Sequence, residues 1–407
     1  MCMQKMECDI LVVGAGAAGV TAALTALRNN LETVILERMG SIGCTNTRLD
    51  ITESVGIEKI VSDLDLPIHN RSNRSRWFSP SYMIDYTSRI YDIYVKRGMD
   101  KDSFETISMA RILDKGGYLL TNSFIKGIEW KNGAINEVEV KSNNKTIQIK
   151  PSFVIGADGT NSTILRFSPL SAYRHVVGEF RAVGIYGRYF DLPEGVTYVF
   201  FDKTIAPGGY IFVAKTRNEE GILGVGFDSS VASFSPINYL KKALNHHLLS
   251  KITKSVEILN RFQGFGKYGI LKRHAIGNLM LAGDAGMWGE PFLCYGLRGA
   301  ILSGYNAAKV CKLSIESSLD GQPANYYESS LREFQNKIKL DLLLRKIFKK
   351  LDNDDLDTII KILADAKEEG LDLDYLFKRN NFSLIKHILK NVRGVFPIVF
   401  KAFSAIF

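Results

Sequence analysis

Three glycines at positions 14, 16 and 19 form the spacing G-x-G-x-x-G near the start of the chain. In this spacing the first glycine allows a tight turn after a strand, the second lets a pyrophosphate approach the backbone, and the third lets a helix pack closely on the strand. The free N–H groups and the dipole at the start of the helix then attract the phosphates. The spacing therefore predicts a dinucleotide site. The alternative is an ordinary strand–helix–strand corner whose glycines only relieve crowding.

Two strands and a helix must position these glycines. The apolar run at 10–13 predicts a buried strand, the alanine-rich residues 17–28 predict a helix, and residues 33–36 predict a second buried strand. Glu37 follows that strand, 18 residues beyond Gly19, and its carboxylate is placed to accept hydrogen bonds from a ribose. All these features fall in order within about 30 residues, which is far more specific than the glycines alone.

Two later strands also run into a glycine–aspartate corner. An apolar strand starting at Phe153 leads to Asp158-Gly159, and Asn161 or Ser162 can cap the helix that follows. A second apolar run, 279–282, leads to Gly283-Asp284. A helix is then predicted from Gly296, and its first N–H groups would face an anionic or carbonyl-rich group.

Composition limits the classes of protein that this chain can be. Its 407 residues are 46% apolar and 23% charged, which indicates a globular protein of about two or three domains. Lys+Arg exceed Asp+Glu by 52 − 43 = 9, which favours acidic partners such as phosphates or anionic lipid head groups. No concentrated basic face is apparent, so we expect no nucleic-acid partner. The five cysteines and six histidines form neither a disulfide framework nor a metal-ligand pattern.

The other segments predict a second sheet and a helical end. Residues 69–76 hold three arginines and no acid, and we interpret them as a loop, either solvated or a docking site for an anionic head group or redox partner. Residues 118–128 predict one strand, and Asn132-Gly133 predicts a hairpin turn. Alternating aromatic strands over 170–268 predict a separate antiparallel sheet that carries a helix at 236–251. Helices follow from about residue 325.

The last residues predict one aromatic helix face. Phe396, Phe400, Phe403 and Phe407 follow helical spacing, and basic residues but no acid follow Asp374. This face either packs on the core or lies on a membrane surface or in a lipid groove. The first strand starts too early for a signal peptide, and no apolar run approaches the ~20 residues of a membrane span. We therefore expect a cytoplasmic protein, with peripheral membrane contact as the alternative for its tail.

Three stretches together resemble the flavoproteins of the p-hydroxybenzoate hydroxylase fold, and most closely the geranylgeranyl reductase family. They are the glycine motif with Glu37, then Ala157-Asp158-Gly159 with Asn161, Ser162 and Arg166, and then Ala282-Gly283-Asp284-Ala285 with Pro291 and Gly296. The resemblance implies FAD in an extended conformation and an α/β fold. That fold has a discontinuous Rossmann-like FAD-binding domain, an antiparallel-sheet substrate domain and a C-terminal helical region. The implied boundaries are 1–68, 99–168 and 269–325 for the FAD-binding parts, 69–98 and 169–268 for the substrate domain, and 326–407 for the helices.

The resemblance also implies roles for single residues. Gly14, Gly16, Ala18 and Gly19 would contact the pyrophosphate, Glu37 the adenosine ribose, and Arg97 would brace the phosphates. Asp284 would contact the ribityl chain or the pyrophosphate, Gly296 and Leu297 would lie under the flavin ring, and Asp158 would be structural or act indirectly. The remaining implied cofactor contacts are Arg38, Gly43, Cys44, Thr45 and Gly283.

For the substrate, residues 206–212 resemble the motif in which an aromatic strand of this family lines a prenyl-lipid tunnel. Tyr210, Phe212 and Tyr295 are the implied substrate contacts. The chain departs from the family pattern at two places. The usual Trp and Phe-Pro of the motif are absent, and residues 292–295 replace the usual glycine-rich run after Pro291.

The implied activity is saturation of C=C bonds in geranylgeranyl chains of lipids or prenyl diphosphate precursors, with NAD(P)H or reduced ferredoxin as external electron donor. An isolated alkene has no carbonyl to polarise, so the protein must position it and hold a nearby acid. Cys44 and Cys294 are the candidate acids, and the pair can also form a redox disulfide; simple packing is the alternative for Cys44. Two other functions stay open: a flavin monooxygenase acting on an aromatic or quinone substrate, and a non-catalytic prenyl-binding protein.

Overall fold

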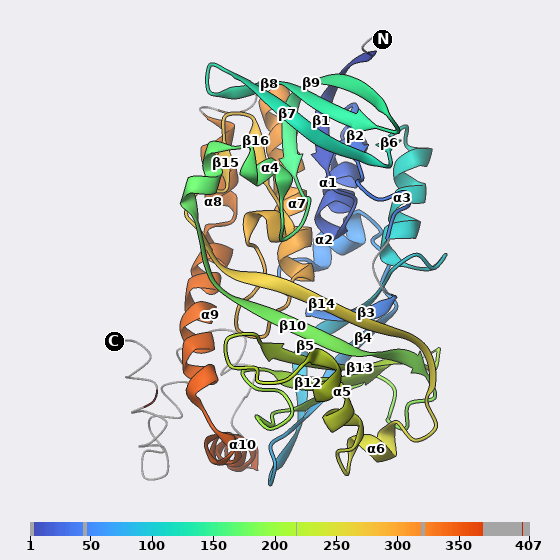
Figure 1. The fold of residues 1–407 in the computed structure, drawn as a ribbon, viewed down its shortest axis with the longest axis vertical. Helices are drawn as coiled ribbons and strands as arrows, with labels where there is room; N and C mark the ends of the chain where they lie inside the picture. Colours follow the sequence, from blue (N-terminus) through green and yellow to red (C-terminus); the bar gives the residue numbers. More distant parts are fainter. Residues whose placement is uncertain are drawn as a thin grey trace.

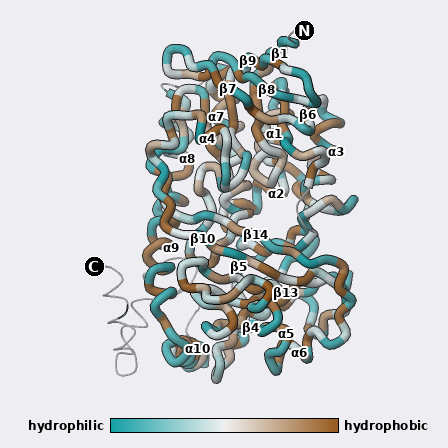
Figure 2. Tube along the Cα trace, viewed as in Figure 1, coloured by the Kyte–Doolittle hydropathy of each residue, from teal (hydrophilic) through white to brown (hydrophobic). Residues whose placement is uncertain are grey.

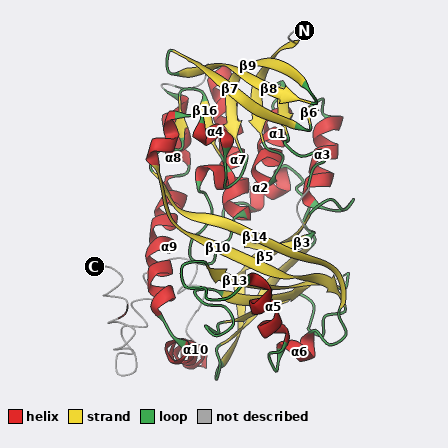
Figure 3. Cartoon of the chain, in the orientation of Figure 1, coloured by secondary structure: helices red, strands yellow, loops and turns green. Residues whose placement is uncertain are grey.

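The computed structural model describes residues 4–43, 47–216, 218–317, 319, 322–368 and 401. It contains two eight-stranded sheets that lie one beyond the other along the long axis of the molecule (Figure 1). Most helices gather around the first sheet, and the long strands β10 (Arg174–Arg188) and β14 (Glu257–Leu271) cross the middle of the molecule (Figure 3). Hydrophobic segments run through both halves (Figure 2).

The first sheet has a parallel centre in the order β16-β9-β1-β2-β6. These strands are β1 (Gln4–Val13), β2 (Thr33–Leu36), β6 (Tyr118–Leu120), β9 (Lys145–Gly156) and β16 (Leu279–Leu281). β15 (Ala275–Ile276) pairs antiparallel with β16, and the hairpin β7 (Ser123–Lys131) and β8 (Ala134–Ser142) joins through β9. The apolar run at the end of β1 is buried on both faces, as the sequence predicts. Ile10 and Val12 face one core, whereas Leu11 and Val13 face the other.

Helices α1 (Ala17–Arg28), α3 (Phe104–Asp114) and α7 (Leu297–Ile315) supply one of these two cores, and the β7–β8 hairpin with α4 (Thr163–Arg166) covers the other face. The predicted bounds of α1 and β2 are confirmed. The single strand predicted over 118–128 is wrong, because Asn122 adopts a positive φ of 48° and divides it into β6 and β7. The predicted Asn132-Gly133 turn is confirmed, with positive φ at both residues.

The second sheet has the order β14-β10-β13-β12-β11-β4-β5-β3. Its remaining strands are β3 (Arg48–Glu53), β4 (Asn70–Phe78), β5 (Met83–Arg97), β11 (Val196–Phe200), β12 (Tyr210–Lys215) and β13 (Glu220–Asp228). It is antiparallel as predicted, except that β11 and β4 run parallel. The loop predicted over 69–76 is wrong, because the backbone from Asn70 onward pairs as strand β4 between β5 and β11.

Strand pairing also places β3 in the second sheet, although β3 lies within residues 1–68, the first part of the predicted FAD-binding domain. The domain boundaries themselves stay a prediction. The helix predicted over 236–251 is wrong as one element, because the chain breaks between α5 (Pro236–Leu244) and α6 (Leu249–Ile252).

The last described helices run from the first sheet to the far end of the second (Figure 1). They are α8 (Pro323–Ser330), α9 (Arg332–Lys350) and α10 (Asn353–Glu368). The remaining elements of the described residues are α2 (Glu58–Asp63) and two 3-10 turns, Pro169–Tyr173 and Gly283–Gly286. Helix α10 begins among acidic residues, with Asp354 and Asp355 in its first turn, where the helix dipole favours negative charge. The predicted aromatic face at 396–407 lies outside the described residues. No helix of the described ranges is long and apolar enough to cross a bilayer.

Candidate functional site

The turn between β1 and α1 brings the three glycines of the first motif together. Gly14 has a φ of +103°, and a Cβ there would lie 2.4 Å from the Ala157 carbonyl oxygen. A Cβ at Gly19 would lie 1.8 Å from the Gly14 carbonyl oxygen, so both positions require glycine for backbone packing. Gly16 differs, because a Cβ there would meet no protein atom within 4 Å. The residue lines a large cavity between the two sheets, described below and called the main cavity. It is therefore the glycine that leaves room for a ligand.

Glu37 lies at the end of β2, where its carboxylate accepts N–H bonds from Ala15 at 3.1 Å and Met39 at 2.8 Å. It thereby fixes the start of the glycine turn. Gly43 packs tightly, since a Cβ there would lie 2.0 Å from the Gly98 carbonyl oxygen. Arg38 is exposed and does not line the cavity. The predicted contacts Cys44 and Thr45 lie outside the described residues, so their roles and the proposed Cys44 disulfide stay predictions.

The second glycine–aspartate corner is mainly structural in its contacts. Asp158 Oδ2 accepts the N–H groups of Thr163 at 2.5 Å and Ile164 at 3.1 Å, and thus caps α4. Burial raises the pKa of this carboxyl group. Ser162 caps the same helix by accepting the Leu165 N–H, as predicted. Gly159, with a φ of +78° and open space at its Cβ position, is the residue of this corner that lines the cavity.

The third corner presents a carboxylate and a helix start to the same cavity. Gly283 adopts a positive φ of 59° and donates its N–H to Ser303 Oγ at 2.8 Å. Asp284 follows, and its exposed side chain faces the cavity. Desolvation by the surrounding protein raises the pKa of Asp284, although the positive charge of Arg97 acts in the opposite direction. Gly296 ends the loop and caps α7, whose first residue is Leu297, and both line the cavity.

Arg97 brings charge to the edge of this cavity. Its guanidinium contacts Asp50 at 2.7 Å and Glu105 at 2.5 Å. Burial alone would raise the pKa of Asp50, but Arg48 and Arg97 hold it below its usual value. Arg97 is therefore held rigidly where β5 ends. The predicted contact of Arg97 with a phosphate stays a prediction.

A single cavity of about 1530 Å³ joins these corners to the second sheet. Its walls include Gly16, Ala18, Asp284 and Gly296 at one side. At the other side they come from the second sheet, α9 and α10 and are mostly apolar. The predicted substrate contacts Tyr210, Phe212 and Tyr295 all line this space. The structure thus brings the expected cofactor and substrate residues into one continuous cavity.

Glycines of β13 make room for the aromatic wall. A Cβ at Gly224 would lie 2.4 Å from the Phe212 ring, and a Cβ at Gly226 would lie 2.4 Å from the Phe180 ring. These glycines belong to the run 221–226 within β13 (Glu220–Asp228). Phe180 and Phe212 can therefore lie flat on the sheet and leave the cavity open.

The loop from Pro291 to Gly296 lines the cavity with its residues 292–296. Cys294 has a positive φ of 56°, and its thiol donates to the Pro291 carbonyl oxygen at 3.3 Å. Burial raises the pKa of Cys294 to about 12, so its thiol keeps its proton at neutral pH. The Tyr210 hydroxyl donates to the Leu293 carbonyl oxygen and holds the same loop. Cys294 is a free thiol in the described structure.

Several buried charges at the cavity were missed by the sequence analysis. Arg298 contacts Glu290 at 2.6 Å and Glu53 at 2.9 Å, and only 3% of its side chain is exposed. Lys337 of α9 contacts the same Glu290 at 2.9 Å and Asp341 at 2.8 Å. These residues come from β3, the loop before α7, α7 and α9. No local pattern of the sequence signals their meeting.

The sequence also carried no local signal for two further arginines near the site, Arg345 and Arg174. Arg345 of α9 contacts Asp228 at 3.0 Å and donates to the Phe292 carbonyl oxygen at 3.2 Å, so it ties the 291–296 loop to the second sheet. The Arg174 Nε is buried with no hydrogen-bond partner among the described residues. Burial lowers the pKa of Arg174, and the Asp284 charge partly offsets this.

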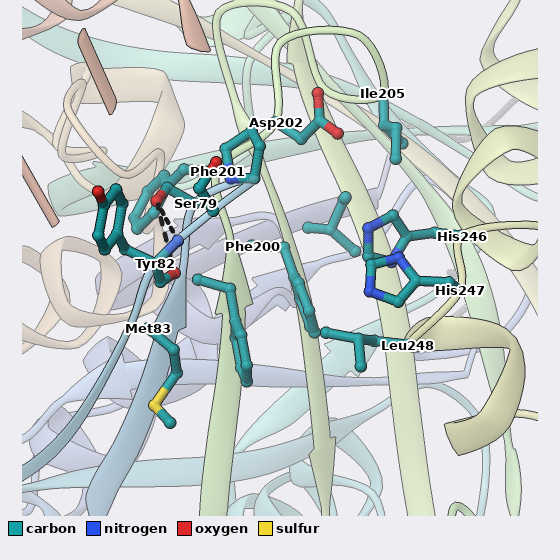
Figure 4. A pocket seen from close by; sticks show the side chains of 14 residues that line it. Ser79, Tyr82, Met83, Phe200, Phe201, Asp202, Ile205, His246, His247 and Leu248 are labelled. Carbon is teal, nitrogen blue, oxygen red and sulfur yellow. Dashed lines mark hydrogen bonds between the residues drawn. The ribbon is translucent and has the colours of Figure 1, made fainter. Parts of the chain in front are cut away.

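These features fit a bound FAD. Two helix starts, at α1 and α7, face one cavity, which suits the pyrophosphate and the flavin ring of a dinucleotide. The open space at Gly16 and Gly159 gives the ligand access to the backbone. A smaller pocket of about 230 Å³ lies apart from this cavity, between the β4–β5 turn and the α5–α6 link (Figure 4). In the described ranges no group of three or more His, Cys, Asp or Glu side chains is arranged to hold a metal ion.

Comparisons with known proteins agree with this geometry. The model of the family of FAD-dependent oxidoreductases matches residues 9–165. A digeranylgeranylglycerophospholipid reductase of Methanococcoides burtonii is 25% identical over 96% of this chain and 96% of its own length. A protein of the same name from Thermoplasma acidophilum is 26% identical over 91% of this chain and 95% of its own.

Solved structures show the same fold. A geranylgeranyl bacteriochlorophyll reductase-like protein from Thermoplasma acidophilum aligns with a TM-score of 0.78 and 24% identity, over 98% of this chain and 100% of its own. An aklavinone-11 hydroxylase in complex with FAD and aklavinone aligns with a TM-score of 0.66 and 16% identity, over 84% of this chain and 69% of its own. This chain therefore has the same fold as these two proteins.

Proposed function

We propose that this chain, which belongs to the geranylgeranyl reductase family of FAD-dependent oxidoreductases, saturates C=C bonds in the isoprenoid chains of a lipid. The observation that carries the proposal is the continuity of one cavity from the helix starts of α1 and α7 to an apolar space walled by α10. An isoprenoid chain needs such a long apolar space, and a reductase needs that space to reach its flavin. The relatives named as reductases of digeranylgeranyl lipids support this choice.

The chain's own residues would position the alkene and hold a proton beside it. When bound and reduced by an external electron donor, the flavin would supply the hydride. Phe180, Phe212 and Tyr295 offer flat apolar walls that would orient the isoprenoid chain and exclude water. The Cys294 thiol stays protonated at neutral pH and lines the cavity, so it can hold the proton that completes the addition. Tyr210 supports this arrangement by fixing the loop that carries Cys294.

An anaerobic assay tests the proposal. The purified protein is reduced with dithionite and mixed with a geranylgeranyl lipid, and the mass of the lipid is then measured by mass spectrometry. We expect flavin reoxidation and a gain of two hydrogens for each saturated double bond. An unchanged lipid, together with oxygenated products from phenols in air, would instead favour an aromatic hydroxylase.

A matched pair of variants on α10 sharpens the assay. Ile359 lines the cavity, whereas the nearby Ile362 does not, and both are half-buried. Ile359→Trp should keep FAD binding and lose saturation of the long chain, because the indole fills the apolar space. Ile362→Trp should retain the activity. Equal activities of the two variants would contradict a substrate path along α10.

A further inference from the structure

One surface segment combines lysines with exposed apolar side chains. Residues 229–256 contain four lysines and two histidines and no aspartate or glutamate. Within this segment Val231 is 41% exposed, Phe234 53% and Ile237 43%. The four lysines, at 241, 242, 251 and 254, are exposed as well. We call these seven residues the basal surface.

The segment is anchored to the second sheet by its other face. Tyr239, Leu240 and Ala243 of α5 and Leu249 and Ile252 around α6 are buried in the core of that sheet. Helix α5 is therefore amphipathic, with its apolar side already used for packing. The exposed apolar side chains of the basal surface are additional to that core, so packing among the described residues does not account for their exposure.

One lysine of the basal surface lies directly over one of its apolar side chains. The Lys242 Nζ lies 4.4 Å from the centre of the Phe234 ring. It also donates to the Thr204 carbonyl oxygen at 3.1 Å, next to the small pocket. Across that pocket the β4–β5 turn exposes Tyr82 and Met83 (Figure 4). A cationic group above an exposed ring suits the boundary between water and lipid.

The position of the basal surface relates it to the main cavity. α5, α6 and α10 lie together at the end of the molecule farthest from the first sheet (Figure 1). α10 contributes Leu356, Ile360 and Leu363 to the apolar wall of the cavity. The Lys361 Nζ on the same helix lies 5.7 Å from the centre of the Tyr82 ring of the β4–β5 turn. The helix that walls the apolar end of the cavity and the basal surface therefore both lie at the end of the molecule that is far from the first sheet.

We propose that the basal surface binds the face of an anionic lipid bilayer. The lysines would contact lipid phosphates, while Val231, Phe234 and Ile237 enter the headgroup region. The acid-free segment favours an anionic partner, and the three exposed apolar side chains favour a bilayer over an acidic protein. The inference rests on the proposed function, because a substrate with isoprenoid chains resides in such a bilayer and would enter the cavity from its α10 end.

Vesicle binding tests this proposal with the full-length protein. We expect binding to phosphatidylglycerol vesicles at low salt, weak binding to phosphatidylcholine vesicles, and release at high salt. Lys241→Gln/Lys242→Gln should bind roughly 30-fold more weakly, from the energy of a lysine near an anionic surface. Phe234→Ser/Ile237→Ser should also bind at least about tenfold more weakly, because apolar contact with the headgroup region is lost.

Matched controls come from the opposite end of the molecule. Lys131→Gln/Lys145→Gln removes two exposed lysines beside the β7–β8 and β8–β9 turns, and Phe124→Ser removes a side chain that is 47% exposed on β7. These variants should bind vesicles like the wild type. Absence of wild-type binding, equal loss in the control variants, or binding of an acidic protein in place of vesicles would overturn the proposal.

Activity measurements separate this proposal from the proposed function. Variants of the basal surface should reduce a detergent-dispersed lipid at the wild-type rate and a vesicle-embedded lipid more slowly. If the wild type reduced neither form but bound vesicles as expected, the proposed function would fail and the basal surface would stand. Equal rates of basal variants and wild type on vesicle-embedded lipid would count against the basal surface alone.

Discussion

The sharpest prediction concerns the difference between Gly16 and Gly19. The Gly16 backbone has a φ of −77°, which alanine adopts without strain, and a Cβ there would meet no protein atom within 4 Å. Gly16→Ala should therefore leave the stability of the flavin-free protein unchanged, or raise it by about 0.4–1 kcal/mol. The new methyl group occupies the space through which a pyrophosphate reaches the backbone. Losing one hydrogen bond to that charged group costs about 1.5–3 kcal/mol, or roughly ten- to hundredfold in FAD affinity.

Gly19→Ala serves as the contrast. Its Cβ would lie 1.8 Å from the Gly14 carbonyl oxygen, so α1 and the turn must separate. We expect at least about 1–3 kcal/mol of destabilisation even without flavin. The assays are urea unfolding of the deflavinated proteins and titration with FAD followed by flavin fluorescence. The reasoning is refuted if Gly16→Ala binds FAD like the wild type, or if it destabilises the flavin-free protein as much as Gly19→Ala does.

Three further predictions concern the buried charges and the thiol. Arg298→Met should destabilise the protein by about 3–5 kcal/mol in urea unfolding, because Lys337 is then the one cation that still contacts Glu290 among the described residues. Adding Glu290→Gln should restore part of the lost stability, and no restoration would argue against the pairing of Arg298 with Glu290. Burial raises the pKa of Asp341 from 3.8 to about 6, so the folded state binds a proton more tightly. Stability should thus fall by about 3 kcal/mol as pH rises through this range, and Asp341→Asn should flatten the slope; an unaltered slope would contradict the assignment. The Cys294 thiol, with a pKa of about 12, should resist iodoacetamide at neutral pH until the protein is unfolded, and rapid alkylation of the folded protein would contradict the raised pKa.

Local patterns determined a large part of what this molecule is. The run 10–13, the glycines and Glu37 predicted the first strand, turn and helix, since each depends on neighbours within about 30 residues. The same local reasoning failed at 69–76. The polar residues there form a strand only because β5 and β11 lie on either side of them, and neither neighbour is visible in the segment itself.

The sequence by itself determined the strand–helix–strand unit, the glycine corners and the aromatic alternation of the second sheet, because periodicity and backbone freedom are local properties. Only the tertiary structure decided that Glu53, Glu290 and Lys337 meet around Arg298, and that α9 and α10 wall the apolar end of the cavity. The energy of a buried charge depends on which partners the fold brings within about 3 Å of it. Those partners lie as far apart in the chain as residues 53 and 298, so no spacing in the sequence records them.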